Sequence, residues 1–475
     1  MVKPRRYYFL GICGTAMASL AVLLKLKGHQ VWGTDAQFYP PMSDFLAAHD
    51  IPLWQGYRVS HLDKPFDVAV IGNALSRGNQ EVEAILNRRL PFRSLPEVIR
   101  QEFVEQKRTI VVTGTHGKTT TTALISWIFH EAGLSPTFLI GGIARNFQSS
   151  VALGEGEFFI IEGDEYDCAF FDKRPKFLHY FPEILIANNL EFDHADIYRS
   201  LADIQDGFRK LMRIVPSRGL VVANQGSAAL KEVLDPVYSR LTWFGASGEA
   251  EWHYQLLEGN GLPQRARIYF RGRPEADLTL PLPGAFQVEN ALAAAIVARE
   301  CGIPWKVIAG AVSRFQGVQR RLEPWPGPPG AQVYEDFAHH PTAVEKTLQA
   351  VRRMHPNRKL VAVFEPRTNT MVQNILQEPL ARALAVADVA VLLPIHRAEK
   401  IPPQRRLSRE RIAQHLSRLN KRCLLLNSPS ELLPALEPFL DDQHVVVIMT
   451  NGNLGGEYQK LKRTLTGMAM KYTGE

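Results

Sequence analysis

The pattern of apolar and polar residues divides the chain into short hydrophobic runs separated by amphipathic stretches. In the N-terminal part, the runs "YYFLGI", "QVWGTD" and "DVAVIG" predict strands, whereas "SDFLAAHD" and "NQEVEAILNRRL" predict helices. Strands that alternate with helices in this way are typical of βαβ units. We therefore predict that the chain begins with a parallel sheet covered by helices.

Two further series of predicted strands follow. The second runs through "RTIVVTGTHGKTT", "EFFIIEGDEYD", "EILIANNLEFDHAD" and "GLVVANQ", and a polar stretch at residues 245–286 predicts a β-rich addition before the helix "VENALAAAIVAREC". The third follows the proline-rich "EPWPGPPG" and comprises "KLVAVFEP", "ADVAVLLP", "KRCLLLN" and "HVVVIMTNG". Because 475 residues exceed what one hydrophobic core usually supports, we predict three α/β domains at residues 1–106, 107–318 and 319–475.

Charge and cysteine content narrow the class of protein. The formal net charge is +7, but the basic residues are scattered, so we interpret them as solvated faces rather than as a nucleic-acid-binding surface. The four cysteines form no C-x-x-C pair, which favours a reducing compartment over a disulfide framework or a zinc site. These cysteines are Cys13, Cys168, Cys301 and Cys423.

The N-terminal apolar run has two interpretations. It follows "KPRR" and contains "AMA", as a secretory signal would. Gly11 and Gly14 interrupt it, however, as a βα turn does, and the run continues into a second predicted strand. We favour the turn and, with it, a cytoplasmic protein without membrane insertion, because no other run approaches the length of a membrane span.

The segment "GTHGKTTTT" follows the apolar "TIVVT" and has the features of a phosphate-binding loop. Where a strand ends and a helix begins, backbone N–H groups meet an anion, a lysine neutralises the outer phosphates and a threonine hydroxyl faces Mg²⁺. Only two residues separate the glycines instead of the usual four, so the match is either chance or a different class of loop. The candidate residues are Gly114, Thr115, His116, Gly117, Lys118, Thr119 and Thr120.

A second glycine-containing turn, "GICGTAM", follows the first predicted strand. It resembles a dinucleotide-binding turn with methionine in place of the third glycine, and Asp35 ends the next strand, where a carboxylate commonly contacts a ribose hydroxyl. By itself the turn is weak evidence for a ligand, because a tight turn can also serve only the packing of a helix. A second alternative that the turn suggests is an NAD-dependent dehydrogenase. The candidate binding residues are Gly14, Thr15, Ala16, Met17 and Asp35.

Two polar side chains follow strands of the second series. Glu162 closes "EFFIIE", and His194 lies in "NNLEFDHAD". With the Thr119 hydroxyl, they offer ligands to a divalent metal bound by ATP phosphates. Each also has a simpler interpretation, Glu162 as a surface acid and His194 as part of a helix cap with Asp193.

The segments "GTHGKTT", "EGDEYD", "NNLEFDH", "ENALAA", "RRLE", "DFAHHP" and "NGNLGG" occur in an order that resembles the Mur ligase family. These are the ATP-dependent amide-forming enzymes of peptidoglycan synthesis, and the resemblance spans nearly the whole chain. It implies a Rossmann-like UDP-binding domain, a central P-loop ATPase domain and a Rossmann-like C-terminal domain for the amine substrate. The phosphate-binding loop would begin so far along the chain because the UDP-binding domain precedes it.

The resemblance also implies roles for single residues. Lys118 resembles the γ-phosphate lysine, and Thr119, Glu162 and His194 resemble the Mg²⁺-binding positions. Asn290 resembles the asparagine that recognises adenine.

Two positions near the third domain, Arg321 and Asp336, resemble residues that reach the nucleotide on domain closure. The turn at Gly14–Met17, with Asp35, would hold the UDP moiety of UDP-N-acetylmuramate rather than NAD. ATP and Mg²⁺ are thus the implied cofactors.

Within the family, "AFFDKR", "NNLEFDHADIY" and "EPRTNTM" resemble members that attach the recycled murein tripeptide L-alanyl-γ-D-glutamyl-meso-diaminopimelate. The alternative is a member that attaches free L-alanine. Arg367, His339 and His340 are predicted to bind the peptide, since arginine suits bidentate pairing with a carboxylate. A binding protein that uses the phosphate loop as a switch is the non-enzymatic alternative. Oligomeric state cannot be predicted from this sequence.

The sequence departs from the family pattern at two places. Phe286 and Gln287 stand where many members have His-Asn ahead of the adenine asparagine. Several members also use a carbamylated lysine in the helix after the metal histidine, and here that helix carries Arg209 and Lys210.

Overall fold

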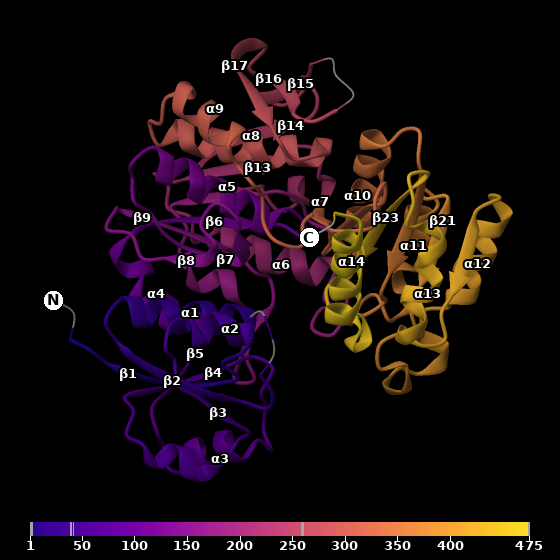
Figure 1. The fold of residues 1–475 in the computed structure, drawn as a ribbon. Helices are drawn as coiled ribbons and strands as arrows, with labels where there is room; N and C mark the ends of the chain where they lie inside the picture. Colours follow the sequence, from indigo (N-terminus) through magenta and orange to yellow (C-terminus); the bar gives the residue numbers. More distant parts are fainter. Residues whose placement is uncertain (1–2, 39, 41, 258–260, 474–475) are drawn as a thin grey trace.

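Three α/β units follow one another along the chain, each built on its own sheet (Figure 1). The computed structural model describes residues 3–38, 40, 42–257 and 261–473. In the described part of the chain, no helix is long and apolar enough to cross a membrane. The predicted three-part α/β architecture is confirmed.

The first sheet is parallel throughout, with the strand order β3-β2-β1-β4-β5. This order runs outward from β1 on one side and from β4 on the other, which is the Rossmann-type arrangement. Its strands are β1 (Arg6–Leu10), β2 (Gln30–Asp35), β3 (Leu53–Gln55), β4 (Val68–Ile71) and β5 (Phe92–Ser94). Its helices are α1 (Thr15–Leu26), α2 (Met42–Ala47), α3 (Gln80–Asn87) and α4 (Leu95–Glu102).

The central sheet has the order β17-β16-β15-β14-β13-β12-β6-β9-β7-β8 and is parallel from β15 to β7, with antiparallel strands at both ends. The β-rich addition predicted at residues 245–286 corresponds to its antiparallel end. The strands are β6 (Arg108–Thr113), β7 (Thr137–Ala144), β8 (Ser149–Ala152), β9 (Phe158–Glu162), β12 (Ile184–Ala187), β13 (Leu220–Asn224), β14 (Arg240–Gly245), β15 (Trp252–Leu256), β16 (Gln264–Phe270) and β17 (Arg273–Leu280). The helices are α5 (Lys118–Glu131), α6 (Leu201–Met212), α7 (Ala228–Lys231), α8 (Ala285–Glu300) and α9 (Trp305–Ser313), and a separate hairpin pairs β10 (Asp167–Ala169) with β11 (Asp172–Pro175).

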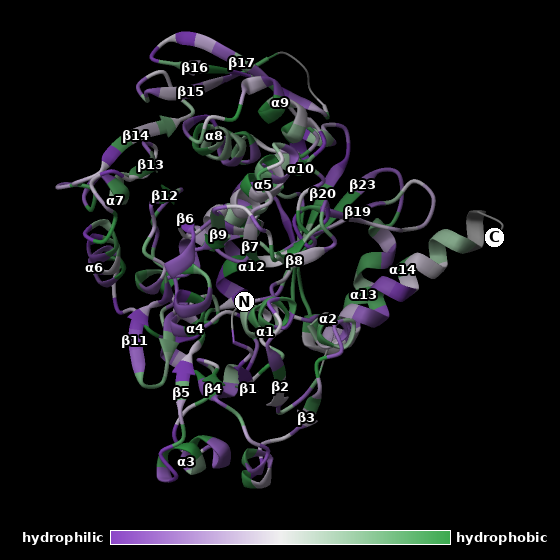
Figure 2. Cartoon of the chain, turned by 90° about the vertical axis from the view of Figure 1, so that its left-hand side faces the viewer, coloured by the Kyte–Doolittle hydropathy of each residue, from purple (hydrophilic) through white to green (hydrophobic). Residues whose placement is uncertain are grey.

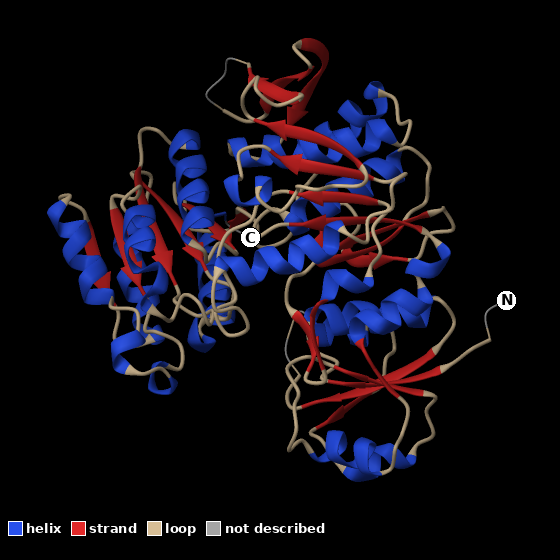
Figure 3. Cartoon of the chain, turned by 180° about the vertical axis from the view of Figure 1, so that it is seen from behind, coloured by secondary structure: helices blue, strands red, loops and turns tan. Residues whose placement is uncertain are grey.

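The third sheet has the order β18-β19-β23-β20-β21-β22 and is parallel except for its edge strand β18. After their first residues, Lys359 and His444, the central strands β20 and β23 are hydrophobic and buried (Figure 2), because helices cover both faces of the sheet (Figure 3). The strands are β18 (Glu323–Trp325), β19 (Gln332–Asp336), β20 (Lys359–Phe364), β21 (Val389–Leu392), β22 (Arg422–Leu425) and β23 (His444–Met449). The helices are α10 (Pro341–Met354), α11 (Gln377–Leu384), α12 (Arg409–Arg418), α13 (Leu432–Leu436) and α14 (Tyr458–Thr473).

The first and central units share a hydrophobic core. Helix α1 lies between the first sheet and strands β7 and β8 of the central sheet, and its buried residues belong to one apolar cluster with residues of β9 and α6. Ser19 of α1 and Ser150 of β8 are joined by a hydrogen bond of 2.8 Å. The carboxyl ends of strands in the central sheet therefore face residues from a neighbouring unit.

Candidate active site

The predicted phosphate-binding loop connects β6 to α5, and neighbouring backbone holds it tightly. Gly114 has φ +128°, and a Cβ there would lie 2.9 Å from the backbone nitrogen of Asn189. The N–H groups of Thr115 and His116 already donate to Asn189, at 3.2 and 2.8 Å. The free N–H groups of the first turn of α5, which begins at Lys118, therefore remain for an anion.

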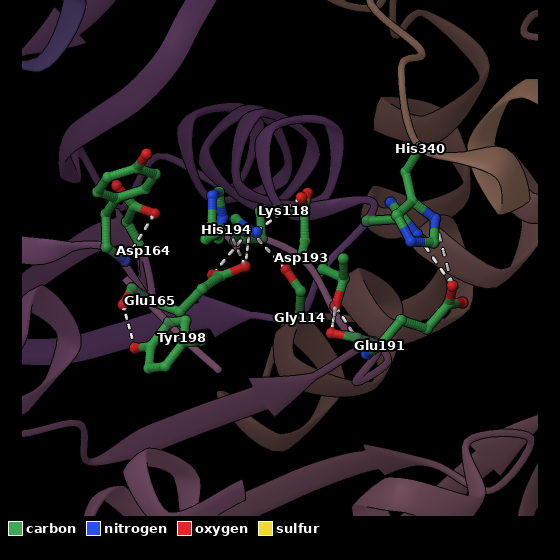
Figure 4. Close-up of polar contacts among 12 residues, drawn as sticks. Gly114, Lys118, Asp164, Glu165, Glu191, Asp193, His194, Tyr198 and His340 are labelled. Carbon is green, nitrogen blue, oxygen red and sulfur yellow. Dashed lines mark hydrogen bonds and ion pairs between the residues drawn. The ribbon is translucent and has the colours of Figure 1, made fainter. Parts of the chain in front are cut away.

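Lys118 lies at the centre of a buried charge cluster (Figure 4). Its ammonium group donates to the carbonyl of Gly114 at 2.6 Å and to both oxygens of Glu165 at 2.9 and 3.1 Å. Burial alone would lower the pKa of Lys118, but the carboxylates of Glu165 and Asp164 outweigh it and hold the pKa above its usual value. Lys118 is therefore charged at neutral pH.

The three predicted metal ligands fall into two adjacent clusters. Thr119 donates its hydroxyl to Glu162 at 3.1 Å, and the N–H of Gly141 donates to the other oxygen of Glu162. His194 instead lies 3.4 Å from Glu165, and its ligand atoms gather with those of Asp164 and Glu165 within 4.8 Å. His194 does not cap a helix, since the next helix, α6, begins only at Leu201.

The turn of the first unit contributes only part of what was predicted. Thr15 and Ala16, at the start of α1, line the central cavity. The Met17 side chain is instead buried in the core. The Asp35 carboxylate accepts the N–H groups of Cys13 and Ala36 at 2.9 and 2.7 Å, so it holds the turn itself in place.

The predicted adenine residue lies next to the phosphate-binding loop. A Cβ on Gly117, which has φ +82°, would lie 2.5 Å from the side-chain oxygen of Asn290. The Asn290 amide donates to Gln287 at 3.1 Å, and Phe286 lines the cavity beside them. Gln287 thus orients Asn290 despite the departure from the family pattern.

The third unit brings three of the predicted residues to the same cavity. The Arg321 guanidinium lies over the Phe337 ring, 4.8 Å from its centre, and the carboxylates of Asp336 and Glu162 act on its charge. Asp336 accepts the N–H groups of Leu322 and Ala338 at 2.8 and 2.7 Å. His339 lines the cavity 3.6 Å from Asp193.

His340 does not face the cavity. It is buried, its Nε2 lies 3.3 Å from the carbonyl of Phe192, and its ring packs 4.8 Å from that of His116. Burial lowers the pKa of His340 to about 4, so the ring is neutral at pH 7. The expectation that His340 contacts a peptide is therefore not met in this structure.

Arg367 lies outside the cavity, at the carboxyl end of β20. Its guanidinium is 3.4 Å from Glu365 and from Asn453. Close by, the side-chain oxygen of Asn451 is buried and has no hydrogen-bond partner among the described residues. Residues that follow β20 and β23 thus form a second polar site in the third unit.

One cavity of about 480 Å³ joins all three units. Sequence reasoning missed several of the residues that shape it, and a signal existed only for some. Asp164 and Glu165 stand in "EGDEYD", two and three residues after Glu162, and Asn188 and Asn189 begin "NNLEFDH", whereas no pattern marked Lys176. Among these missed residues, Asp164, Lys176, Asn188 and Asn189 line the cavity, and Glu165 is the ion-pair partner of Lys118.

Helix α6, which carries a carbamylated lysine in several family members, presents Arg209 and Lys210 away from this cavity. Arg209 and Lys210 of α6 are exposed and do not line the cavity. Lys210 pairs with Asp206 on the surface at 2.7 Å. Neither residue replaces a carbamylated lysine in this arrangement.

Three family models together match most of the chain. They are described as "Mur ligase family, catalytic domain" (residues 6–107), "Mur ligase middle domain" (residues 112–298) and "Mur ligase, glutamate ligase domain" (residues 320–452). The chain therefore belongs to the Mur ligase family, as its motifs predicted.

Individual relatives refine the comparison. The chain is 40% identical over 469 residues to the UDP-N-acetylmuramate–L-alanyl-gamma-D-glutamyl-meso-2,6-diaminoheptandioate ligase of Escherichia coli K12, covering 98% of this chain and 99% of the relative. It is 33% identical to the UDP-N-acetylmuramate–L-alanine ligase of Desulforapulum autotrophicum, over 84% and 85% of the two chains. A crystal structure of a murein peptide ligase from Psychrobacter arcticus 273-4 has a TM-score of 0.74 at 33% identity, covering 97% of this chain and 99% of that one.

Proposed function

We propose that the protein is an ATP-dependent carboxylate–amine ligase that joins the lactyl carboxylate of UDP-N-acetylmuramate to the amine of L-alanyl-γ-D-glutamyl-meso-diaminopimelate. The observation that carries this proposal is the single cavity to which all three units contribute, lined by Thr15 of the first unit, Lys118 and Glu162 of the central unit and Arg321 of the third. Identity over nearly the full length to a ligase named for this tripeptide supports the choice of amine. The ligation would serve peptidoglycan recycling in the bacterial cytoplasm, without nucleic acid as a partner.

The chemistry requires activation because a carboxylate has no adequate leaving group for attack by an amine at neutral pH. The lactyl carboxylate attacks the γ-phosphorus of ATP, which forms an acyl phosphate and releases ADP. The peptide amine then attacks the acyl carbon, and inorganic phosphate leaves. Lys118, charged and fixed at the loop, stabilises the phosphoryl group during transfer. No side-chain nucleophile is needed.

The donor set at the phosphate loop suits Mg²⁺. The Thr119 hydroxyl and the Glu162 carboxylate lie 3.1 Å apart, and oxygen ligands of this kind are those that Mg²⁺ prefers. Burial raises the pKa of Glu162, and a cation beside it would relieve this penalty. We place His194, with Asp164 and Glu165, at a second cation position. When bound, Mg²⁺ supplies positive charge to the ATP phosphates.

The remaining proposed nucleotide contacts come from other residues that line the cavity. Asn290 would read adenine, and Arg321, held against Phe337 and beside Asp336, would reach the phosphates. On the opposite wall, the N–H groups at the start of α1, from Thr15 to Met17, would bind the diphosphate of the UDP-sugar. Gly14 and Asp35 support this turn.

The peptide would extend from the cavity into the third unit. His339 lies at the cavity wall, and Arg367 lies beyond it with the unpartnered oxygen of Asn451 nearby. A cation and an amide acceptor match the distal carboxylate and amino group of a diamino acid. We keep the proposed domain boundaries at 106/107 and 318/319. His340 contacts the carbonyl of Phe192 in the central unit.

Mass spectrometry after incubation with ATP, Mg²⁺, UDP-N-acetylmuramate and either amine tests the proposal. We expect the tripeptide adduct and ADP, with much less product from free L-alanine. A preference for L-alanine would replace the proposal with the L-alanine ligase. Nucleotide binding without product would indicate a switch protein, and oxidation coupled to NAD would indicate a dehydrogenase.

A further inference from the structure

Thr370 connects the third unit to the segment that carries His194. It lies in the loop that follows β20 and is completely buried. Its hydroxyl donates to the carboxylate of Asp193 at 2.7 Å and accepts the backbone N–H of Ala195 at 3.1 Å. One side chain of the third unit thus bonds to both neighbours of His194 in the sequence.

These bonds bear directly on the backbone of His194. That residue has φ +56°, a left-handed conformation that few residues other than glycine adopt without support. Its own N–H donates to the same Asp193 oxygen, at 2.7 Å, that accepts the Thr370 hydroxyl. The Asp193 carboxylate therefore holds the backbone before His194, and the Thr370 hydroxyl holds the backbone after it. Thr370 also hydrogen-bonds to that carboxylate.

The same loop carries Arg367, three residues earlier. Arg367 stands at the second polar site, where the peptide is proposed to bind. Between the two, the Asn369 side chain lies near the hydroxyl of Tyr166, whose ring packs 4.5 Å from that of His194. The loop therefore touches the proposed amine site at one end and the surroundings of His194 at the other.

We propose that Thr370 is a positioning residue that makes the placement of His194 depend on how the amine-substrate loop of the third unit is docked. Peptide bound at Arg367 orders residues 367–370, and Thr370 transmits that order to the Asp193–Ala195 backbone. The enzyme would then assemble its second cation position fully only when the amine substrate is present. This inference rests on the proposed function for the identity of the peptide, but not for the contact itself.

Three variants separate the hydroxyl from the rest of the loop. Thr370→Val keeps the shape and removes both hydrogen bonds, whereas Thr370→Ser keeps the hydroxyl. Thr368→Val is the matched control, because the Thr368 hydroxyl accepts only the N–H of Met371 inside the same loop at 3.2 Å. If Thr370→Val does not fold, Thr370→Cys, which retains only a weak donor, takes its place.

Hydrogen–deuterium exchange of the ligand-free protein gives the first measurement. We expect amides 193–198 to exchange at least tenfold faster in Thr370→Val than in the wild type, Thr370→Ser or Thr368→Val. Adding the tripeptide should slow exchange at residues 193–198 and 367–372 in the wild type, but only at 367–372 in Thr370→Val. In steady-state assays, Thr370→Val should lower kcat at least tenfold and leave KM for UDP-N-acetylmuramate within twofold.

Unchanged exchange at 193–198 in Thr370→Val would overturn the positioning role. So would equal damage from Thr370→Ser, since the loss would then come from shape rather than from the hydroxyl. Protection of 193–198 by the peptide in Thr370→Val would remove the coupling. Failure of the peptide to protect 367–372 in the wild type would instead count against the proposed function, and the ligand-free comparison would still decide the role of Thr370.

Discussion

The ammonium group of Lys118, which lines the cavity, and the carboxylate of Glu165 form a buried ion pair of 2.9 Å. The attraction raises the pKa of Lys118 and, although burial opposes it, lowers that of Glu165. Both groups are therefore charged in the structure before any phosphate arrives. ATP must compete with Glu165 for Lys118, and the His194 side chain lies within 3.4 Å of the carboxylate that would be released.

Replacing Lys118 tests the phosphoryl-transfer step. We expect Lys118→Ala to lower kcat by at least about 10²–10³-fold, because a preorganised charge at the transferring group is removed. Binding of the UDP-sugar, measured by calorimetry, should stay within threefold of the wild type, since the start of α1 is untouched. Near-normal ligation would exclude the loop from the mechanism.

Lys210→Ala is the matched lysine control. Lys210 is exposed and paired with Asp206 on α6, so this change should leave turnover within twofold. A large loss of activity would instead mean that a modified lysine on α6 takes part in the reaction.

Gly117→Ala tests the close packing of the phosphate loop against Asn290. The added Cβ would lie 2.5 Å from the Asn290 oxygen, so the loop or the adenine contact must shift. We expect ATP affinity to fall by about tenfold or more, which corresponds to about 1.4 kcal/mol. Gly133→Ala is the control, because Gly133 has a similar φ of +76° but nothing within 4 Å of its Cβ. Both variants should lose some thermal stability, and only Gly117→Ala should lose ATP affinity.

The sequence predicted the elements with the strongest patterns. Apolar runs such as "VVVIM" and "LVAVF" located strands of the third sheet because strands buried on both faces contain few polar residues. Strand β7 was missed, since "TFLIGGIA" contains two glycines in its middle. There, the space beside Gly141 is filled by the Glu162 carboxylate, which a local pattern cannot reveal.

The residues of the candidate site likewise divide into those that a local sequence pattern predicts and those that depend on the fold. Lys118 and Thr119 could be predicted because strand, loop and helix are adjacent in the sequence. The pairing of Lys118 with Glu165 and of His194 with Glu165 depends on three strands being neighbours in the sheet, β6 beside β9 and β12. His340 was misjudged because its burial comes from contact with Phe192 in another unit, 148 residues away.

The buried His340 predicts a pH dependence of stability. Its pKa is lowered to about 4 by burial, from about 6.5 in the unfolded chain, so the unfolded state binds more protons between these values. The contribution of neutral His340 to the free energy of unfolding is complete above pH 6.5. It is lost as the pH falls towards 4, by up to about 3 kcal/mol. The charged and titratable groups that face the ring are His116, Glu191, Asp193 and His339.

Urea unfolding between pH 4 and 7.5 measures this effect. In the wild type, the free energy of unfolding should fall more steeply below pH 6.5 than in His340→Asn. Replacement of the exposed His130 by asparagine is the control and should leave the slope unchanged. Equal slopes in the wild type and His340→Asn would show that His340 is not held neutral by burial.

Arg367→Lys tests how the amine is selected. A planar guanidinium can form two parallel hydrogen bonds with a carboxylate, whereas an ammonium group acts as a point charge. We expect KM for the tripeptide to rise by about 10-fold to 100-fold, the equivalent of a charge-assisted hydrogen bond. KM for ATP and for UDP-N-acetylmuramate should stay within twofold, because Arg367 does not line the main cavity.

Gly452→Ala tests the same site without removing Arg367. A Cβ on Gly452 would collide with the side chain of Arg367, so the guanidinium must move although the arginine is retained. This variant should impair use of the tripeptide like Arg367→Lys and spare ATP binding. Steady-state assays with the tripeptide and with free L-alanine, run side by side, provide the measurement. If neither variant changes tripeptide use, the distal carboxylate is bound elsewhere, and Arg367 is not part of the peptide site.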